Sequence, residues 1–481
     1  MNTTTIHPEA SVCSAEPGDG FLDRHQQPLA LAVLVSAQFL VMLDTSIVNV
    51  ALPSIQSDLG FTPSAVTWVV NAYVLSFAGL LLLSGRASDL FGRRRLFTAG
   101  AGLFTLGTLL AALATGPLML IGGRVVQGVG AAALSPAAMS LLLATFPGAQ
   151  RARAMGAWGA ASALGGATGV VTGGLLAGGV GWRSVFIVTV PVSVAAAALA
   201  RRVLAPDTVT TRRSLDWVGA ALATGTVITF VHGAVDAGDH AWTSPRVLGL
   251  LAASVVLAAT FVVVERRVRD PLVPLEVFSS ALTRRGVVLA VLGGSTRGST
   301  FVLIALYFQQ ALAMSPQQAG IAMVPTSLAG LTVSLRILPR ALKTFGPLRT
   351  LVVGLVLLAG GQLWLAYSPQ NVSYVLAVLP GLLLVATGVA LSFTPTTMVV
   401  ASAVPASHTG LAAGLASASM QVGGALGTAA FIIVGASASQ QATGVLTGSG
   451  FTAAFTAAAV VTLATAALGW RATSSRARGE L

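Results

Sequence analysis

The chain has 481 residues, of which 54% are hydrophobic and only 9% are charged. Soluble proteins carry about 25% charged residues, so this composition excludes a soluble enzyme, a disordered chain and a disulfide-rich secreted domain. The single cysteine, Cys13, allows no intramolecular disulfide. What remains is a protein that crosses a membrane many times. The net charge of +12 lies between long apolar runs, so we interpret it as a topology signal and expect no nucleic-acid partner.

Residues 1–28 are polar, and we interpret them as a disordered cytoplasmic tail rather than a signal peptide. The rest of the chain contains fourteen apolar segments long enough to cross a hydrocarbon core of about 30 Å, which predicts an all-α integral membrane protein. The predicted spans are Leu29–Ala51, Val66–Ser84, Leu96–Ala114, Leu118–Leu141, Ala154–Gly178, Ser184–Val203, Trp217–Val235, Val247–Val264, Val287–Leu312, Ala319–Leu338, Thr350–Tyr367, Tyr374–Thr394, Leu411–Val434 and Thr452–Trp470.

The basic residues fall almost entirely on one side of this map. With both termini in the cytoplasm, 23 of the 27 lie in cytoplasmic segments, whereas Arg183 and Arg246 lie outside and Arg124 and Arg297 fall inside spans. Because cytoplasmic loops retain positive charge, this distribution supports the orientation. Lys343 is the only lysine, a bias typical of GC-rich bacterial genomes, and we therefore expect a bacterial plasma membrane.

Lys343 also bears on the energy source. A phosphate-binding loop requires a Gly-Lys-Ser/Thr sequence, but Leu342 precedes this lysine. We therefore expect no ATP and no other bound cofactor, with protons as the coupling ion.

The order of the spans suggests a repeated plan. Short basic loops occur at Gly85–Arg95 and again at Arg336–Arg349, and repeated halves around a central site are common in transporters. We expect a six-helix bundle at residues 29–203, linkers and two extra spans at 204–286, a second six-helix bundle at 287–470 and a tail at 471–481.

Ionisable residues inside a membrane are costly and usually functional. Asp44 and Arg124 are placed roughly 12 Å and roughly 10 Å from the outer ends of their spans at about 1.5 Å per residue. A carboxylate near a buried cation is able to bind and release a proton during a cycle. Alternatively, Asp44 lies at the interface and Arg124 only clamps helices. Arg297, near a midplane, faces a cavity or backbone carbonyls, and Asp216 is expected at the membrane interface.

Small residues recur every four positions in the fifth span. Such a face lets two helices approach closely, and the spacing fits either tight static packing or a sliding contact. The glycines concerned are Gly165, Gly169, Gly173 and Gly174.

Several segments, in this order along the chain, resemble the major facilitator superfamily, and within it the fourteen-span drug:proton antiporters. The resemblance covers nearly the whole chain. The segments are Leu43–Pro53, Trp68 with Tyr73, Gly85–Arg94, Arg124 with Gln127, Gly128 and Gly130, the glycines of the fifth span, Trp182-Arg183 with Phe186, Leu215–Trp217 and Tyr307–Gln310. Two departures are Leu90 in place of an arginine and Val170 in place of a proline, which implies a softened kink.

The resemblance implies a bundle of two six-helix halves with two additional central spans. It also implies roles for four sets of residues. These are Asp44 and Arg124 for proton coupling; Asn49, Gln127, Arg297 and Gln309 in a substrate cavity; Gly85, Asp89, Gly92, Arg93 and Arg94 in a gating loop; and Gly165, Gly169, Gly173 and Gly174 in the antiporter helix.

We therefore expect a monomeric, proton-coupled antiporter that exports a small amphipathic compound, such as an antibiotic, by alternating access. The alternative is a carrier for an anionic metabolite that uses Arg124 and Arg297. We expect no enzyme, because the spans show neither a nucleophile–base pair nor a set of metal ligands.

Overall fold

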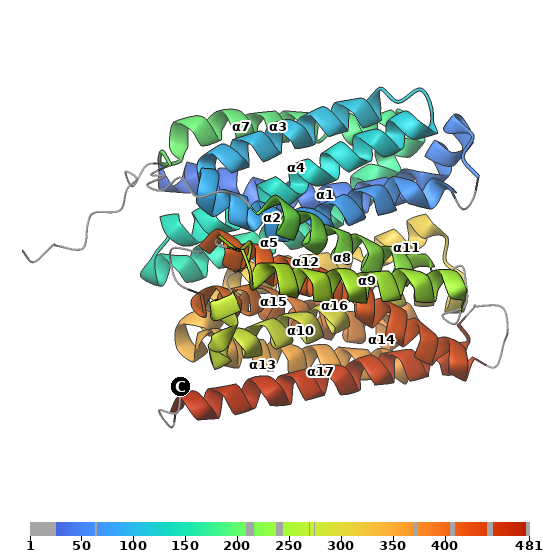
Figure 1. Ribbon diagram of the computed structural model, residues 1–481. Coiled ribbons are helices and arrows are strands. Elements are labelled where there is room, and N and C mark those ends of the chain that lie inside the picture. The colour runs from blue at the N-terminus through green and yellow to red at the C-terminus, as the bar shows by residue number, and fades with distance from the viewer. Residues whose placement is uncertain are drawn as a thin grey trace, which may run out of the picture.

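The computed structural model (Figure 1) contains helices joined by turns, with no strand in the part of the chain that it describes. The described residues are 26–62, 65–207, 216–236, 244–268, 270–273, 275–368, 373–404, 409–439 and 446–477. Most of the predicted N-terminal tail, including Cys13, lies outside these ranges, as do the end of the C-terminal tail and Leu215.

The N-terminal half is a bundle of long apolar helices. Its elements are α1 (Gln27–Leu59), η1 (Ala65–Thr67), α2 (Trp68–Phe91), α3 (Arg93–Ala112), α4 (Pro117–Thr145), α5 (Gly148–Gly179), α6 (Arg183–Ile187) and α7 (Val190–Val203). Helix α1 packs along α5, while α4 packs against both α2 and α3. The predicted sixth span is broken between α6 and α7, just before Pro191, whose ring supplies no backbone N–H.

The C-terminal half repeats this plan. Its elements are η2 (Leu275–Ser279), α10 (Ala281–Leu306), η3 (Tyr307–Ala311), α11 (Pro316–Ala322), α12 (Val324–Thr332), η4 (Val333–Ile337), α13 (Leu338–Ala366), α14 (Tyr374–Ala377), α15 (Leu379–Ser402), α16 (Thr409–Ala438) and α17 (Gly448–Ala477). Helix α10 packs along α16 as α1 does along α5, and α13 packs along α15 as α3 does along α4. The two halves lie one above the other in Figure 1.

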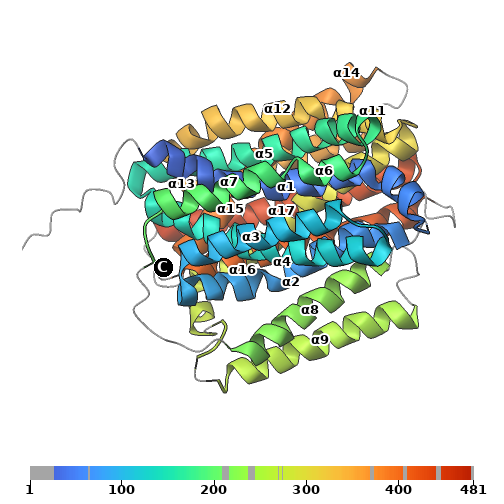
Figure 2. The same ribbon diagram turned by 90° about the horizontal axis from the view of Figure 1, so that it is seen from above.

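Two further helices, α8 (Trp217–Asp236) and α9 (Pro245–Glu265), form a hairpin on the outside of the bundle (Figure 2). Helix α8 contacts α2 of the N-terminal half and α16 of the C-terminal half. The hydroxyl of Thr224 donates to the carbonyl of Gly79 at 2.9 Å, which fixes α8 on α2. The extra helices therefore cover one of the seams between the halves.

The length and hydropathy of the helices fit the predicted number of crossings. Twelve helical segments of the described chain are long and apolar enough to span a membrane. One of them, Gln318–Ala366, has 49 residues, enough for two crossings, and α8 supplies a shorter apolar helix at Trp217–Gly233. These segments together accommodate fourteen crossings.

Several helices extend beyond the predicted spans, and two cases matter here. Helix α1 continues through Pro53 to Leu59, eight residues beyond the predicted end of its span, so Asp44 lies near the middle of this helix. A helix is able to project beyond the hydrocarbon core, and apolar patterning does not mark where it ends. The expected loop Arg336–Arg349 is largely helical, because α13 begins at Leu338 and is broken only at Gly346.

Gly346 and Gly92 break the backbone at corresponding places in the two halves. Both have positive φ, 74° at Gly346 and 102° at Gly92, a conformation that L side chains rarely adopt. Gly92 directly precedes α3, which packs along α4, and Gly346 lies inside α13, directly before the part of that helix that packs along α15. These sharp connections lie at one end of the bundle, which we call the arginine-rich end because Arg93, Arg94 and Arg95 begin α3 there.

Candidate functional site

Asp44 on α1 and Arg124 on α4 form an ion pair inside the N-terminal half. Arg124 Nη1 lies 2.7 Å from Asp44 Oδ2, and the two side chains are 0% and 1% exposed. Arg124 Nε also donates to the carbonyl of Val69 on α2 at 2.8 Å. The guanidinium therefore joins three helices, and the expectation that the two residues share one level is met.

Gln127, one turn after Arg124, extends this pair into a network. Its amide oxygen accepts from Arg124 Nη1 at 2.6 Å, and its amide nitrogen donates to Asp44 Oδ1 at 2.7 Å and to the hydroxyl of Thr108 on α3 at 2.9 Å. Both carboxylate oxygens of Asp44 thus accept a hydrogen bond. Thr108 and the Val69 carbonyl were not anticipated from the sequence, in which neither a threonine nor a backbone group stands out within an apolar span.

Aromatic rings and two unpartnered polar atoms surround the pair. The Arg124 guanidinium carbon lies 4.4 Å from the centre of the Tyr73 ring, close enough for a cation–π contact. Arg124 Nη2 and the Tyr73 hydroxyl are both buried without a hydrogen-bond partner. The site therefore has spare donors beside the carboxylate.

The C-terminal half holds a neutral network at its core. The Gln362 amide on α13 donates to the hydroxyl of Thr300 on α10 at 2.7 Å and accepts from the hydroxyl of Thr462 on α17 at 2.8 Å. All three residues are fully buried. Gln362 was missed in the sequence, although an amide among the apolar residues of a span is a legible signal.

Arg297 on α10 has no ionic partner among the described residues. It is only 4% exposed, and its Nη1 and Nη2 atoms make no hydrogen bond. The guanidinium folds back over Gly293, one turn earlier on the same helix, where an added Cβ would lie 2.7 Å from Nη1. The alternative of pairing with backbone carbonyls is therefore not observed for these two nitrogens.

The four residues predicted for a substrate cavity do not form one cluster. Gln127 belongs to the Asp44 network, and Arg297 lies alone in the other half. Asn49 is exposed, and its amide donates to the carbonyl of Thr45 on its own helix at 2.7 Å. Gln309 is also exposed, within η3.

Three of the four α5 glycines press directly on α1. A Cβ on Gly165 would lie 2.6 Å from the carbonyl oxygen of Phe39, and one on Gly169 would lie 2.7 Å from the Ser46 side chain. Gly173 meets the Ile47 backbone in the same way, whereas a Cβ on Gly174 would lie 4.0 Å from its nearest neighbour, the Val50 side chain. With Val170 in place of proline, α5 runs unbroken from Gly148 to Gly179.

At the arginine-rich end, Asp89 connects the two halves. Its Oδ1 and Oδ2 accept from the backbone N–H groups of Gly410 and Leu411, each at 2.9 Å, at the start of α16. A carboxylate there is stabilised by the positive end of the helix dipole. Arg93 lies 3.4 Å from Asp89, and a Cβ on Gly85 would lie 2.6 Å from the carbonyl oxygen of Gly410.

A second carboxylate binds the backbone at the start of α3, at the same end of the bundle. Asp207, which follows α7, accepts from the backbone N–H groups of Arg94 at 2.8 Å and Arg95 at 3.0 Å. The Arg94 side chain donates a hydrogen bond to the carbonyl of Leu204, near the end of α7, at 3.0 Å. The Asp207 carboxylate occupies the space beside Gly92, so a side chain at that position would collide with it. Asp207 was missed because the sequence gives no sign that a linker residue caps α3.

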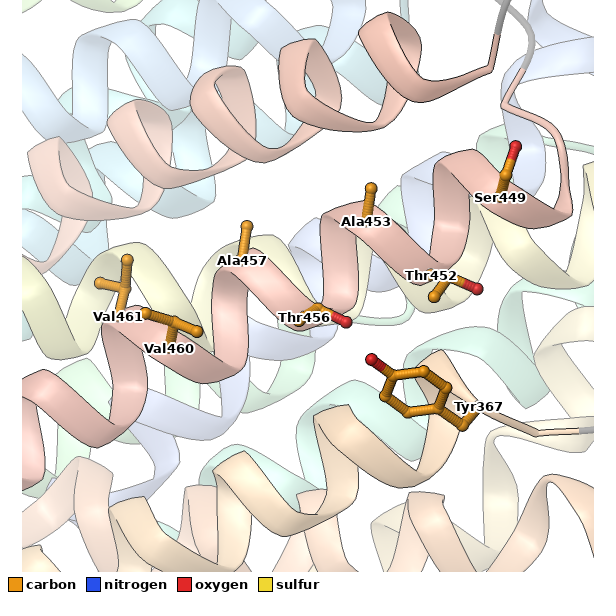
Figure 3. Close-up of a pocket in the computed structure, with 8 residues that line it drawn as sticks. All are labelled: Tyr367, Ser449, Thr452, Ala453, Thr456, Ala457, Val460 and Val461. Carbon is orange, nitrogen blue, oxygen red and sulfur yellow. The ribbon is translucent and has the colours of Figure 1, made fainter.

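A surface pocket with a volume of about 810 Å³ lies elsewhere, on the outer part of the C-terminal half. It is lined by Tyr367, at the end of α13, and by seven residues of α17, which point to one side of that helix (Figure 3). Helix α17 lies on the side of the C-terminal half that faces away from the N-terminal half (Figure 1). This pocket is therefore separate from the Asp44 network and from the seam between the halves.

Comparison with known proteins identifies the class of the chain. Residues 34–428 match the Major Facilitator Superfamily, so the chain belongs to this family of membrane transporters. Its helical architecture, with two similar halves, agrees with that membership.

Several bacterial antibiotic export and resistance proteins are similar along most of the chain. The chain is 37% identical over 409 residues to the cephamycin export protein of Amycolatopsis lactamdurans, with 84% of each chain covered. It is 38% identical over 464 residues to the puromycin resistance protein of Streptomyces alboniger, covering 93% of this chain and 91% of the relative. It is 35% identical over 445 residues to the tetracenomycin C resistance and export protein of Streptomyces glaucescens, covering 90% and 80%.

Solved structures share the fold at low sequence identity. The human organic anion transporter MFSD10 superposes with a TM-score of 0.67 at 16% identity, over 93% of this chain and 100% of that one. The proton:xylose symporter XylE superposes with a TM-score of 0.65 at 16% identity, over 92% and 95%. At this identity the likeness concerns the fold alone.

Proposed function

We propose that this protein is a proton-coupled antiporter that exports an antibiotic or another small amphipathic compound across the plasma membrane of a bacterium. The observation that carries the proposal is the fully buried Asp44–Arg124 pair, joined to Gln127 inside the N-terminal half. The similarity to exporters of cephamycin and tetracenomycin C supports the substrate class.

The chemistry of the pair explains how a proton could drive movement. An ionised Asp44 holds Arg124 through a charge-assisted bond at 2.7 Å. Protonation removes the negative charge and leaves the buried guanidinium without its counterion, which is unfavourable in a dry interior. The α1–α4 contact then rearranges until Arg124 finds new partners. Because α1 also packs on the α5 glycines, a movement of α1 relative to α4 changes the close backbone contacts between α1 and α5.

The arginine-rich end is the proposed cytoplasmic gate. There Asp89 joins α2 to α16, and α5 approaches the Ser334 backbone through Gly156. The charge distribution of the sequence supports placing this end, and both termini, in the cytoplasm. We further propose that the protein works as a monomer and uses the proton gradient rather than ATP.

A resistance panel tests the exporter proposal. The chain is expressed in a pump-deficient bacterial host, and growth is compared on puromycin, a cephamycin, tetracenomycin C and lincomycin. We expect increased resistance to at least one of them and its complete loss in Asp44→Asn. The matched control is Asp58→Asn at the end of the same helix, where the bridge to Arg183 is half exposed and contributes little.

The control variant should retain resistance. If Asp44→Asn protects the host as well as the original chain does, at equal expression, the carboxylate has no part in export. If no compound in a wider antibiotic and dye panel is exported, the proposed substrate class is wrong.

The anionic alternative has one observation in its favour, the unpartnered guanidinium of Arg297. The Arg124 charge is balanced by Asp44, whereas no described acid pairs with Arg297. A buried, unpaired cation in a membrane protein fits an anionic group of a substrate. The anion-carrier alternative therefore has weaker support for Arg124 than for Arg297. An anion site at Arg297 is also compatible with export of an anionic compound.

Arg297→Gln separates these readings. Transport of the exported compound is measured in the presence of a cephamycin, which is a carboxylic acid, and in the presence of puromycin, which is an amine. The inhibition by the two competitors is then compared. An anion site predicts at least a tenfold weaker effect of the acid in Arg297→Gln and little change for the amine. Equal behaviour of both compounds in the two proteins would show that Arg297 does not bind an anionic group of a substrate.

A further inference from the structure

Asp216 and Glu265 meet at the base of the α8–α9 hairpin. Asp216 directly precedes α8 and Glu265 is the last residue of α9. Both lie at the arginine-rich end, because the neighbouring Ala220 and Leu272 pack with Leu90 near the end of α2. They are 9% and 3% exposed. A Cβ on Gly219 would touch Asp216 Oδ2 and Glu265 Oε1 together, so these two oxygens lie side by side, within hydrogen-bonding range. The sequence had suggested only an interfacial position for Asp216.

The four carboxyl oxygens of the pair outnumber the hydrogen-bond donors around them by one. Asp216 Oδ1 accepts from the backbone N–H of Gly219 at 2.8 Å. Glu265 Oε1 and Oε2 accept from the backbone N–H groups of Leu272 and Val273, at 3.2 and 3.1 Å. The fourth oxygen, Asp216 Oδ2, is buried and has no partner. Two facing carboxyl groups with an unsatisfied oxygen between them lack one donor, and a single proton supplies it.

Within the part of the chain that the structure describes, no cation takes this role. After α9, Arg266 and Arg267 are exposed, and Asp270 and the exposed Glu276 add only negative charge. On α2, Arg86 and Asp89 are the charged residues of this end, and Asp89 is already occupied by Gly410, Leu411 and Arg93. Among the described residues, none forms a salt bridge with either carboxyl group. Two ionised carboxylates side by side repel each other, and a proton bound between them removes that repulsion.

The pair is attached to the seam between the halves. Leu272 and Val273, whose N–H groups hold Glu265, are buried in one apolar cluster with Leu90 of α2 and Leu411 of α16. Leu90 and Leu411 are neighbours in sequence of Asp89 and Gly410, which join the two halves. The protonation state of the pair therefore acts on the segment that packs against this junction.

We propose that Asp216 and Glu265 form a proton-binding site, distinct from Asp44, that shares one proton between Asp216 Oδ2 and Glu265 Oε1. With the proton bound, the pair carries one negative charge and the hairpin base is closed over Leu90 and Leu411. Without it, two buried negative charges face each other and loosen the 272–273 segment. This inference does not depend on the proposed export function.

Infrared spectroscopy of the full-length protein in detergent tests the site directly. A shared proton predicts a protonated-carboxyl band in the original chain at neutral pH, where a lone carboxyl group with its ordinary pKa of about 4 is ionised. Asp216→Asn and Glu265→Gln, which keep the shape of the protonated group, should each lose the same band. The matched control Glu276→Gln, on the exposed turn η2, should keep it.

Absence of the band from the original chain at neutral pH would overturn the proposal without any variant. Persistence of the band in either single variant would also overturn the proposal, so the test needs only one variant that folds. Transport is not measured in this experiment, so its failure is distinct from failure of the proposed antiport.

Thiol labelling tests the effect on the 272–273 segment. In a Cys13→Ser background, Val273→Cys is labelled with a maleimide, and its rate is divided by that of exposed Ser279→Cys to remove the pH dependence of the thiol itself. The normalised rate should rise at least threefold from neutral to alkaline pH and stay flat when Glu265→Gln is added. A flat profile without Glu265→Gln, or the same rise with it, would contradict the coupling.

Discussion

The two halves of the bundle share one helix arrangement but fill their cores differently. In the N-terminal half, Asp44 and Arg124 neutralise each other, and Gln127 bonds to both. In the C-terminal half, Gln362 joins two threonine hydroxyls, and Nη1 and Nη2 of the buried Arg297 have no partner among the described residues. This difference supports the proposal that one half carries the proton-coupling charge pair and that the other offers a cation to a ligand.

Arg124 and Arg297, one buried arginine from each half, give the largest expected contrast. Removing one partner of a buried ion pair costs about 3–5 kcal/mol, so Arg124→Gln should greatly lower the unfolding temperature in detergent. Arg297→Gln removes an unpaired buried charge and should leave stability unchanged or raise it. Both are measured by thermal unfolding against Arg183→Gln, whose half-exposed bridge is worth about 0–1 kcal/mol. Equal losses in Arg124→Gln and Arg297→Gln would erase the contrast between the halves.

Gln127 and Gln362, one fully buried glutamine from each half, test the same comparison with a smaller expected effect. Gln127→Leu removes hydrogen bonds to charged groups, worth about 1.5–3 kcal/mol, whereas Gln362→Leu removes neutral ones, worth about 0.5–1.5 kcal/mol. The hydroxyls of Thr300 and Thr462 also bond to carbonyls of their own helices, so they keep partners. Denaturation in detergent should therefore rank Gln127→Leu as the more destabilised. The reverse order would place the critical polar network in the C-terminal half.

Close contacts between a glycine and a neighbouring helix are a feature that the two halves share. Gly169 presses on α1 as Gly427 presses on the Ser295 backbone of α10, and an added Cβ has no room at either place. Gly169→Ala and Gly427→Ala should each cost about 1–3 kcal/mol through overpacking and slow transport. Gly174→Ala, with its nearest neighbour at 4.0 Å, is the matched control. Stability and transport that match the control in either variant would show that this helix contact tolerates separation.

Much of this organisation was predictable from the sequence, because bilayer thickness and charge asymmetry act on long segments. Those constraints gave the all-helical fold, the repeat and the candidates Asp44, Arg124 and Arg297. Local breaks were less legible: α1 passes through Pro53 to Leu59, whereas α13 begins well before the apolar stretch that predicted it. Apolar composition alone does not decide where a helix stops.

The partners of the charged groups were the least predictable part. Thr108, the Val69 carbonyl and Asp207 are separated by long stretches of sequence from the groups that they bind, and only packing brings them together. Glu265 directly follows the predicted span Val247–Val264, and it is buried against Asp216 because the 272–273 segment folds back over it. Such contacts depend on tertiary structure, which a pattern of residue types along the chain does not contain.

The most direct test of the central claim measures proton coupling in Asp44→Asn. The purified protein is reconstituted in vesicles, and the antibiotic that gave the strongest resistance is followed under an imposed pH gradient and, separately, in exchange at equal pH. We expect the original chain to accumulate the compound against its gradient. Asp44→Asn should retain exchange at equal pH but accumulate nothing when the pH gradient is imposed. Undiminished gradient-driven accumulation by Asp44→Asn would contradict the account.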